Sequence, residues 1–178
     1  MNEDWHCLDL ARRGDEAAWQ ALFDRHYANL VRLAIFLTGS LEAAQDVAQE
    51  SFVRLLGIKL THTEGTFKAL MSTIAYRLAL KERRRLSSQS SVHKMEVIDD
   101  TPSGLERAIA DEADRAIFRA IQSLANDQRE IITLRFFGGH TYEEIARVTG
   151  VPLGTVKSRI FYAIKNCRER LRKEGVLK

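Results

Sequence analysis

The side chains best suited to chemistry lie near the C-terminus of this 178-residue chain. They are hydroxyl, cationic and aromatic groups at Thr155, Lys157, Ser158, Arg159, Phe161, Tyr162 and Lys165. At helical spacing they face away from an apolar stripe that contains Val156 and Ile160. Cations and hydroxyls gathered on one side of a helix bind base edges and phosphates, so this face favours nucleic acid as its ligand.

Two helices joined by a tight turn are predicted to position this face. The segment HTYEEIARVTGVPLGTVKSRIFYAIKNCRERL, residues 140–171, contains a helix that ends at Gly150 and a second helix that begins after Pro152. Thr141 with Glu144 three residues later is a capping box that starts the first helix. The predicted inward positions are Ile145, Ala146, Val151, Val156 and Ile160. The pattern predicts a helix-turn-helix whose second helix enters the major groove. A solvated amphipathic helix would not need the turn, the capping box and the charge together.

The rest of the chain predicts an all-α protein. It contains two prolines, and no segment alternates apolar and polar residues as a strand does. Helices are expected over about 4–13, from a cap at Asp15 to Gly39, from a cap at Ser40 to Gly57, over 66–85, after Pro102, and from a cap at Asn126 or Asp127 to Gly138. The inward positions expected in these helices include Leu56, Ile117 and Phe136.

The distribution of charge divides the chain into four segments. Residues 1–66 carry 6 basic and 10 acidic side chains, 67–86 carry 6 and 1, 87–128 carry 4 and 8, and 129–178 carry 11 and 5. We therefore predict two small helical bundles, 1–86 and 105–178, joined by a flexible acidic linker over 87–104. Each basic block lies at the C-terminal end of its own bundle.

Enzymatic, metal-dependent and membrane-inserted functions find no support in the residues. No apolar run approaches the roughly 20 residues that cross a bilayer. There is no Gly-rich phosphate loop or nucleophile elbow, and the five histidines are scattered. Cys7 and Cys167 belong to no metal-ligand spacing. We expect a cytoplasmic protein that is not an enzyme and holds no cofactor or metal.

Two long segments resemble the extracytoplasmic-function (ECF) sigma factors of bacterial RNA polymerase. The segment SLANDQREIITLRFFGGHTYEEIARVTGVPLGTVKSRIFYAIKNCRERL is similar to sigma domain 4, which reads the −35 promoter element. The segments GDEAAWQALFDRHYANLVRLAIFLTGSLEAAQDVAQESFVRLL and TFKALMSTIAYRLALKERRR are similar to sigma domain 2, which binds the −10 element and the polymerase clamp. Together they cover nearly the whole chain outside the linker.

The resemblance implies a role for each group of candidate residues. For the −35 element, Lys157, Ser158, Phe161 and Tyr162 would read bases, and Thr155, Arg159 and Lys165 would hold phosphates. For the −10 element, the contacts would come from Lys59, Thr61, His62, Thr63, Arg77, Lys81 and Arg84, with Arg83 and Arg85 in the same basic block. Asp46, Gln49 and Glu50, at i, i+3 and i+4, would dock on the largest polymerase subunit.

The implied function is an alternative sigma factor that joins core RNA polymerase and directs transcription initiation at promoter DNA. An anti-sigma factor, soluble or membrane-bound, is expected as a further partner. The competing hypothesis is a helix-turn-helix regulator that does not join polymerase. Three residues depart from common family residues: Leu70 stands in place of Trp, Arg77 in place of Asn, and Tyr162 in place of Arg.

Overall fold

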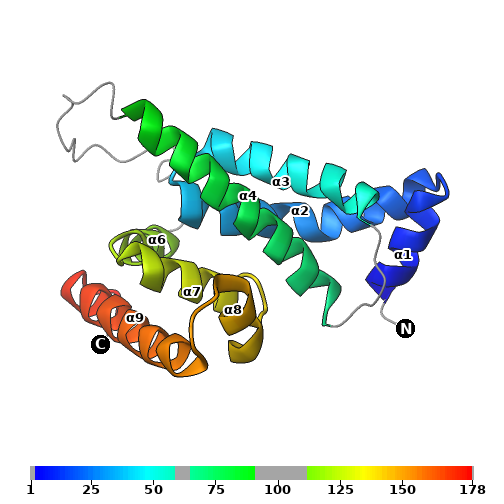
Figure 1. Ribbon diagram of the computed structural model, residues 1–178. Coiled ribbons are helices and arrows are strands. Elements are labelled where there is room, and N and C mark those ends of the chain that lie inside the picture. Colours follow the sequence, from blue (N-terminus) through cyan, green and yellow to red (C-terminus); the bar gives the residue numbers. More distant parts are fainter. Residues whose placement is uncertain (1–2, 59–64, 91–111, 178) are drawn as a thin grey trace.

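The computed structural model describes residues 3–58, 65–90 and 112–177. Every regular element in those residues is an α-helix, which confirms the all-α prediction. In chain order the helices are α1 (Glu3–Arg12), α2 (Glu16–Thr38), α3 (Leu41–Gly57), α4 (Phe67–Ser90), α6 (Glu112–Gln122), α7 (Asn126–Phe136), α8 (Tyr142–Thr149) and α9 (Leu153–Lys173) (Figure 1). Within the described part of the chain, none of these helices is long and apolar enough to cross a membrane.

The starts of α2 and α3 are fixed by the predicted caps. The Asp15 carboxylate accepts a hydrogen bond from the Ala18 N–H at 2.9 Å, and the Ser40 hydroxyl accepts one from the Ala43 N–H at 3.3 Å. Gly39 ends α2 with φ of 74°, a left-handed conformation that a side chain would strain. These caps turn the chain sharply, so α3 folds back along α2.

The first bundle consists of α1 to α4, with α2 at its centre. Leu22 and Leu33 of α2 and Phe52 of α3 are buried, and Met71 from α4 belongs to the same cluster. The edge of the Trp19 ring meets Phe52 at 5.6 Å between ring centroids. This apolar packing holds α3 and α4 side by side and sets which of their faces remain exposed.

The second bundle contains α6 to α9, and here several predictions were wrong. The N-cap of α7 is Ala125, and no side chain caps it. The predicted caps are used elsewhere: Asn126 accepts a hydrogen bond from Arg129, and Asp127 pairs with Arg159. Phe136, predicted to be buried, is 58% exposed. Ile117 on α6 is also exposed, because its neighbour Phe118 takes the inward position. In the first bundle, Leu56 on α3 is exposed in the same way, and its neighbour Leu55 is buried.

Helix α4 runs past its predicted end at Arg85 and reaches Ser90. Most of the predicted linker, and the start of the helix predicted after Pro102, fall within residues 91–111, outside the described residues. The later part of that predicted helix is α6.

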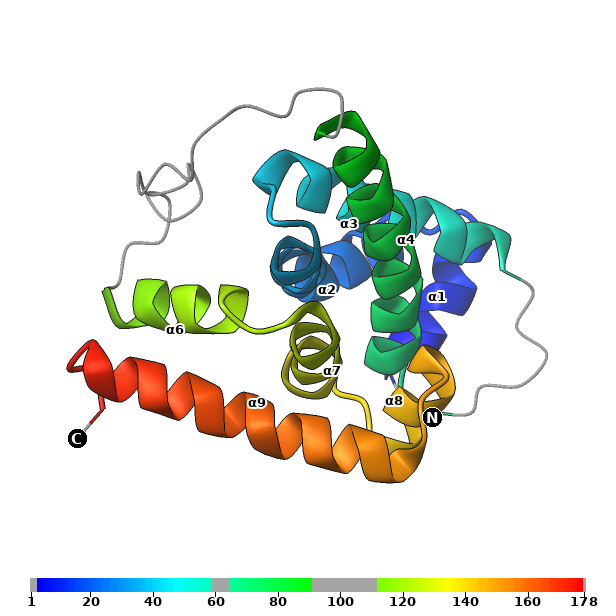
Figure 2. The same ribbon diagram turned by 60° about the vertical axis from the view of Figure 1, so that its left-hand side comes forward.

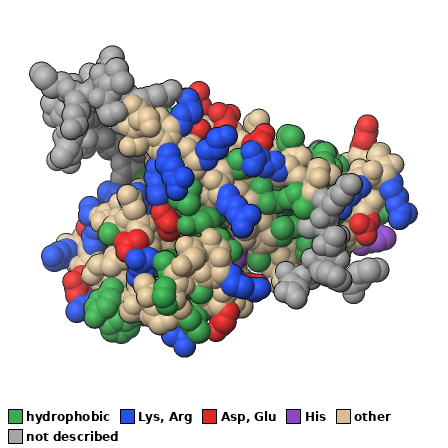
Figure 3. Space-filling view, in the orientation of Figure 1, with side chains coloured by type: hydrophobic (Ala, Val, Ile, Leu, Met, Phe, Trp, Pro, Cys, Tyr) green, Lys and Arg blue, Asp and Glu red, His purple; other side chains and the backbone are tan. Residues whose placement is uncertain are grey.

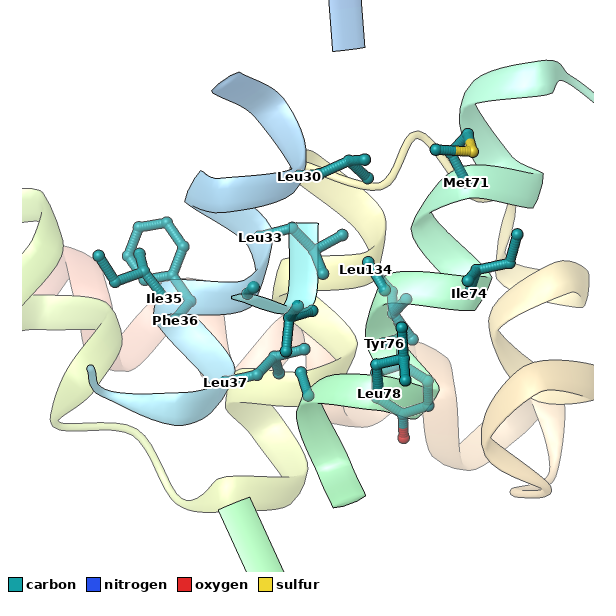
Figure 4. Packing of buried hydrophobic residues seen from close by; sticks show 14 of the residues in the cluster. Leu30, Leu33, Ile35, Phe36, Leu37, Met71, Ile74, Tyr76, Leu78 and Leu134 are labelled. Carbon is teal, nitrogen blue, oxygen red and sulfur yellow. The ribbon is translucent and has the colours of Figure 1, made fainter. Parts of the chain in front are cut away.

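The two bundles pack directly on each other. Helix α7 lies against α2, and the buried residues of both bundles form one continuous cluster (Figure 2). Leu134 of α7 is fully buried in this cluster, and in Figure 4 it lies in the middle of the labelled side chains of α2 and α4. The described residues therefore share one hydrophobic core.

Candidate nucleic-acid interface

The helix-turn-helix is built by α8 and α9, as predicted. The Thr141 hydroxyl accepts a hydrogen bond from the Glu144 N–H at 3.1 Å, and the Glu144 carboxylate accepts one from the Thr141 N–H at 2.7 Å. This reciprocal pair is the predicted capping box. Gly150 ends α8 with φ of 73°, and its N–H donates to the Ala146 carbonyl at 2.9 Å. Only glycine adopts that φ without strain, so Gly150 sets the angle between the two helices.

The inward face of α9 anchors it to the rest of the second bundle. Val156, Ile160 and Ala163 are buried, and Ile145 of α8 packs in the same cluster. The two other predicted inward residues, Ala146 and Val151, are half-buried. Full burial of a Val or Ile side chain contributes about 1.5–3 kcal/mol, so this stripe fixes the rotation of α9. It also determines which residues α9 presents to solvent.

The predicted base-reading strip is exposed along α9. Lys157 and Ser158 are exposed, and Phe161 and Tyr162 are 64% and 53% exposed. The two rings meet edge to face, with 5.4 Å between centroids. The Ser158 hydroxyl donates to the Thr155 carbonyl within its own helix, at 3.0 Å. Exposed aromatic rings of this size beside a cation and a hydroxyl suit thymine methyl groups, sugars and base edges.

The cations predicted to hold phosphates flank this strip and carry weak partners. Arg159 lies 3.1 Å from a carboxylate oxygen of Asp127 on α7, and Lys165 lies 3.9 Å from Glu169. Exposed ion pairs of this kind contribute less than about 1 kcal/mol, so a phosphate can replace the carboxylate. Thr155 is half-buried at the start of the helix.

A second basic surface lies on α4. Arg77, Lys81 and Arg84 are exposed, and Lys and Arg side chains gather over this helix in Figure 3. Two other arginines of the block are already paired: Arg85 binds Glu82 on the same helix, and Arg83 binds Glu130 of the second bundle at 2.6 Å.

Arg77 borders two surface hollows. One, of about 240 Å³, is also lined by Leu70, His140 and Arg147, and the other, of about 440 Å³, by Arg54, Ile58 and Ile74. The remaining predicted −10 residues, Lys59, Thr61, His62 and Thr63, lie outside the described residues.

The acidic face of α3 carries apolar neighbours that the sequence reasoning missed. Asp46, Gln49 and Glu50 are all exposed, and Glu50 accepts a hydrogen bond from Arg54 at 2.8 Å. Val53 and Leu56 continue the same side of the helix and are 63% and 45% exposed. Their spacing from Asp46, at i+7 and i+10, is the signal that would have found them. We call this mixed acidic and apolar row the α3 strip, and such a surface is typical of a protein contact.

Comparison with known families covers both bundles. Residues 22–89 match the family model described as "Sigma-70 region 2", and residues 114–167 match "Sigma-70, region 4". The chain is 31% identical to the RNA polymerase sigma-H factor of Pseudomonas aeruginosa, over 92% of this chain and 91% of that protein. It is 31% identical to the ECF RNA polymerase sigma factor SigL of Mycobacterium tuberculosis, over 93% and 96%. The chain belongs to the ECF RNA polymerase sigma factors.

Solved structures agree with this ECF sigma factor fold. The structure of CnrH in complex with the cytosolic domain of CnrY matches with a TM-score of 0.64 and 19% identity, over 97% of this chain and 99% of that one. The sigma factor RpoE of Bartonella quintana, in complex with the anti-sigma factor NepR, matches with a TM-score of 0.62 and 23% identity, over 86% and 96%.

For this ECF sigma factor, the departures from common family residues differ in exposure. Leu70 is half-buried, whereas Arg77 and Tyr162 are exposed.

The sequence reasoning also missed residues at the contact between the bundles, where Tyr76 and His140 are buried and Glu130 is half-buried. No periodicity marks those three positions, because the role of each side chain depends on a hydrogen-bond partner that is far away in the sequence.

Proposed function

We infer that this chain acts as an alternative sigma factor, which binds core RNA polymerase and directs it to promoters with its own −10 and −35 elements. It acts by binding and positioning, not by chemistry of its own. The carrying observation is that one chain exposes both the base-reading strip on α9 and the α3 strip. A regulator that does not join polymerase needs only the first of these.

Each surface has a proposed partner. Lys157, Ser158, Phe161 and Tyr162 read the −35 bases, while Thr155, Arg159 and Lys165 hold phosphates. The α3 strip docks on polymerase, where its apolar residues add burial to the acidic contacts.

The exposed cations of α4 bind the −10 region. Arg77, Lys81 and Arg84 supply the charge, and residues 57–65 hold a flipped base. Extruding a base costs a few kcal/mol, which contacts from this region must offset.

An anti-sigma factor is the proposed negative regulator. The support is the likeness in fold to the sigma factor RpoE, whose solved structure is a complex with the anti-sigma factor NepR. We place the chain in the cytoplasm because core polymerase and promoter DNA are there.

Complex formation with purified core RNA polymerase tests this function. On gel filtration, the chain is expected to elute with core enzyme as a stable complex. A helix-turn-helix regulator that does not join polymerase would elute alone. If the chain elutes alone while binding duplex DNA, the sigma-factor function is wrong and the regulator is right.

A further inference from the structure

Polar contacts join the two bundles around a shared apolar centre. Phe36 of α2 meets Phe118 and Phe137 of the second bundle, at 5.5 and 4.6 Å between ring centroids. The Asn29 amide donates to the Phe137 carbonyl at 2.9 Å, and the Gln122 amide donates to the Ile35 carbonyl at 3.3 Å. Such a mixture of polar and apolar contacts is typical of interfaces between domains that separate during function.

Glu130 is the charged centre of this contact. One carboxylate oxygen binds the Arg83 guanidinium at 2.6 Å, and the other accepts a hydrogen bond from the Tyr76 hydroxyl at 2.9 Å. Both donors belong to α4, two helical turns apart on one face. Glu130 on α7 therefore fastens the second bundle to the basic helix of the first.

Removing this carboxylate would leave two cations facing each other. Arg129 is half-buried next to Glu130; burial and then the charge of Arg83 lower its pKa, whereas the charge of Glu130 raises it. The single negative charge of Glu130 pairs with Arg83 and offsets part of the repulsion between the two guanidinium groups. A neutral side chain in its place would leave Arg83 and Arg129 to repel each other in a partly dry environment.

With the two bundles packed together, which we call the closed form, the chain is too short to reach both promoter elements. Elements centred near −10 and −35 lie roughly 25 base pairs, or about 85 Å, apart along B-DNA. A compact chain of this length has a radius of gyration of about 16 Å, which corresponds to a diameter of about 40 Å. The bundles must separate for α4 and α9 to reach both elements.

We propose that Glu130 latches the free chain in a closed form and that this latch must open before the chain can bind both promoter elements in the polymerase complex. The proposal rests on the function inferred above and adds a regulatory contact within the chain itself. In the closed form the Glu130 carboxylate pairs with the Arg83 guanidinium, to which a DNA phosphate would otherwise bind. Because the polymerase complex holds the bundles apart so that they reach both elements, forming that complex includes opening the latch, and closure lowers the apparent affinity for polymerase by the fraction of open chains.

The first test measures the separation of the bundles in the free, full-length chain. Spin labels are attached at Ala17→Cys and Arg168→Cys, two exposed positions on α2 and α9, in a Cys7→Ser, Cys167→Ser background. Pulsed electron paramagnetic resonance should give one short distance for this parent. Glu130→Gln should add a longer, broader population. Asn29→Ala, which removes a separate contact between the bundles, should shift the distances in the same direction.

Glu82→Gln is the matched control. It removes the same charge from an arginine pair on α4, but its partner Arg85 lies in the same bundle. The Glu82→Gln distances should equal those of the parent. There is no latch if the distances in Glu130→Gln and Asn29→Ala also equal those of the parent. There is also none if the parent already shows a long, broad distribution of distances.

The second test measures affinity for core RNA polymerase with the same four chains. Glu130→Gln should bind about tenfold more tightly, since a charge-assisted hydrogen bond is worth about that factor or more in an equilibrium constant. Glu82→Gln should bind like the parent. A Glu130→Gln chain that opens but binds no more tightly would show that closure regulates nothing. Binding of core polymerase to none of the four chains would refute the sigma-factor function itself, whereas an unopened Glu130→Gln refutes only the latch.

Discussion

The two basic surfaces of this protein are built in different ways. On α9 the expected contacts follow one another within a single helix, and the four residues of the base-reading strip are all exposed. On α4 the cations lie along one helix of the first bundle, and one of them, Arg83, is already bound by Glu130 of the other bundle. The first surface can be recognised from its periodicity, whereas the state of the second depends on which bundle covers it.

The largest expected effect concerns the first bundle and its polymerase contact. Asp46→Lys with Glu50→Lys should abolish complex formation with core polymerase, because two cations replace the anions of the α3 strip. Both side chains are exposed, so circular dichroism should report unchanged helix content. The matched control is Glu16→Lys with Asp24→Lys, the same change of charge at exposed positions on α2. Unchanged affinity of the first double variant would show that the acidic face of α3 is only solvated surface.

The second prediction concerns base reading by α9. Lys157→Ala or Ser158→Ala should each cost about 1–3 kcal/mol on the preferred −35 sequence and relax the preference there. Arg159→Ala or Lys165→Ala should weaken binding to all sequences alike and reduce its dependence on salt. Binding of the full chain with core polymerase to a panel of −35 variants, at several salt concentrations, measures both effects. The opposite pattern would mean that the two faces of α9 have been assigned the wrong way round.

A third prediction concerns pH and the contact between the bundles. Burial lowers the pKa of His140, and the nearby charge of Lys68 lowers it further, although Glu144 and the carbonyls of Leu134 and Ala69 raise it. The unfolded chain therefore takes up its proton first, as the pH falls below about 6.5. The contribution of His140 to the free energy of unfolding should therefore be fully present above that pH. It should decrease as the pH falls towards the lower pKa of His140 in the folded chain.

Urea unfolding of the parent and His140→Leu at pH 7.5, 6.5 and 5.5 measures this. The variant should lose less stability on acidification than the parent. His6→Gln, at an exposed histidine of α1, is the control. Burial also lowers the pKa of His26, so His140→Leu should retain part of the effect. Equal losses in the parent and in His140→Leu would contradict the assignment to His140.

The smallest expected effect is at the cysteines. Both thiols are free and half-buried, and burial raises the pKa of Cys167, which keeps little of it as reactive thiolate. Replacing Cys7 and Cys167 with Ser should leave transcription unchanged under reducing and mildly oxidising conditions. A difference between parent and variant that depends on oxidation would identify a redox sensor.

Local sequence rules predicted the features that depend on neighbours in the chain. Asp15 and Ser40 cap helices, Thr141 and Glu144 form the capping box, and Gly150 makes the turn. Each of these depends on hydrogen bonds or φ values within a few residues. The strip on α9 was predictable for the same reason.

The errors occurred where partners from distant parts of the chain decide the outcome. Asn126 or Asp127 was expected to cap α7, but the helix already begins at Asn126, and the Asp127 carboxylate pairs with Arg159 of α9. Phe136 fits the apolar stripe of α7, but Phe137 occupies the space beside Phe36. Periodicity alone does not distinguish adjacent positions at the edge of a stripe, because the facing helix selects the one that is buried.

Transcription from a random promoter library is the most direct test of the central claim, that this chain directs core polymerase to promoters. The reaction contains core RNA polymerase, the full chain and no other sigma factor. We predict transcripts that start downstream of a shared pair of −10 and −35 sequences, and Lys157→Ala should relax the −35 member of that pair. Transcripts that appear only after another sigma factor is added would contradict the claim.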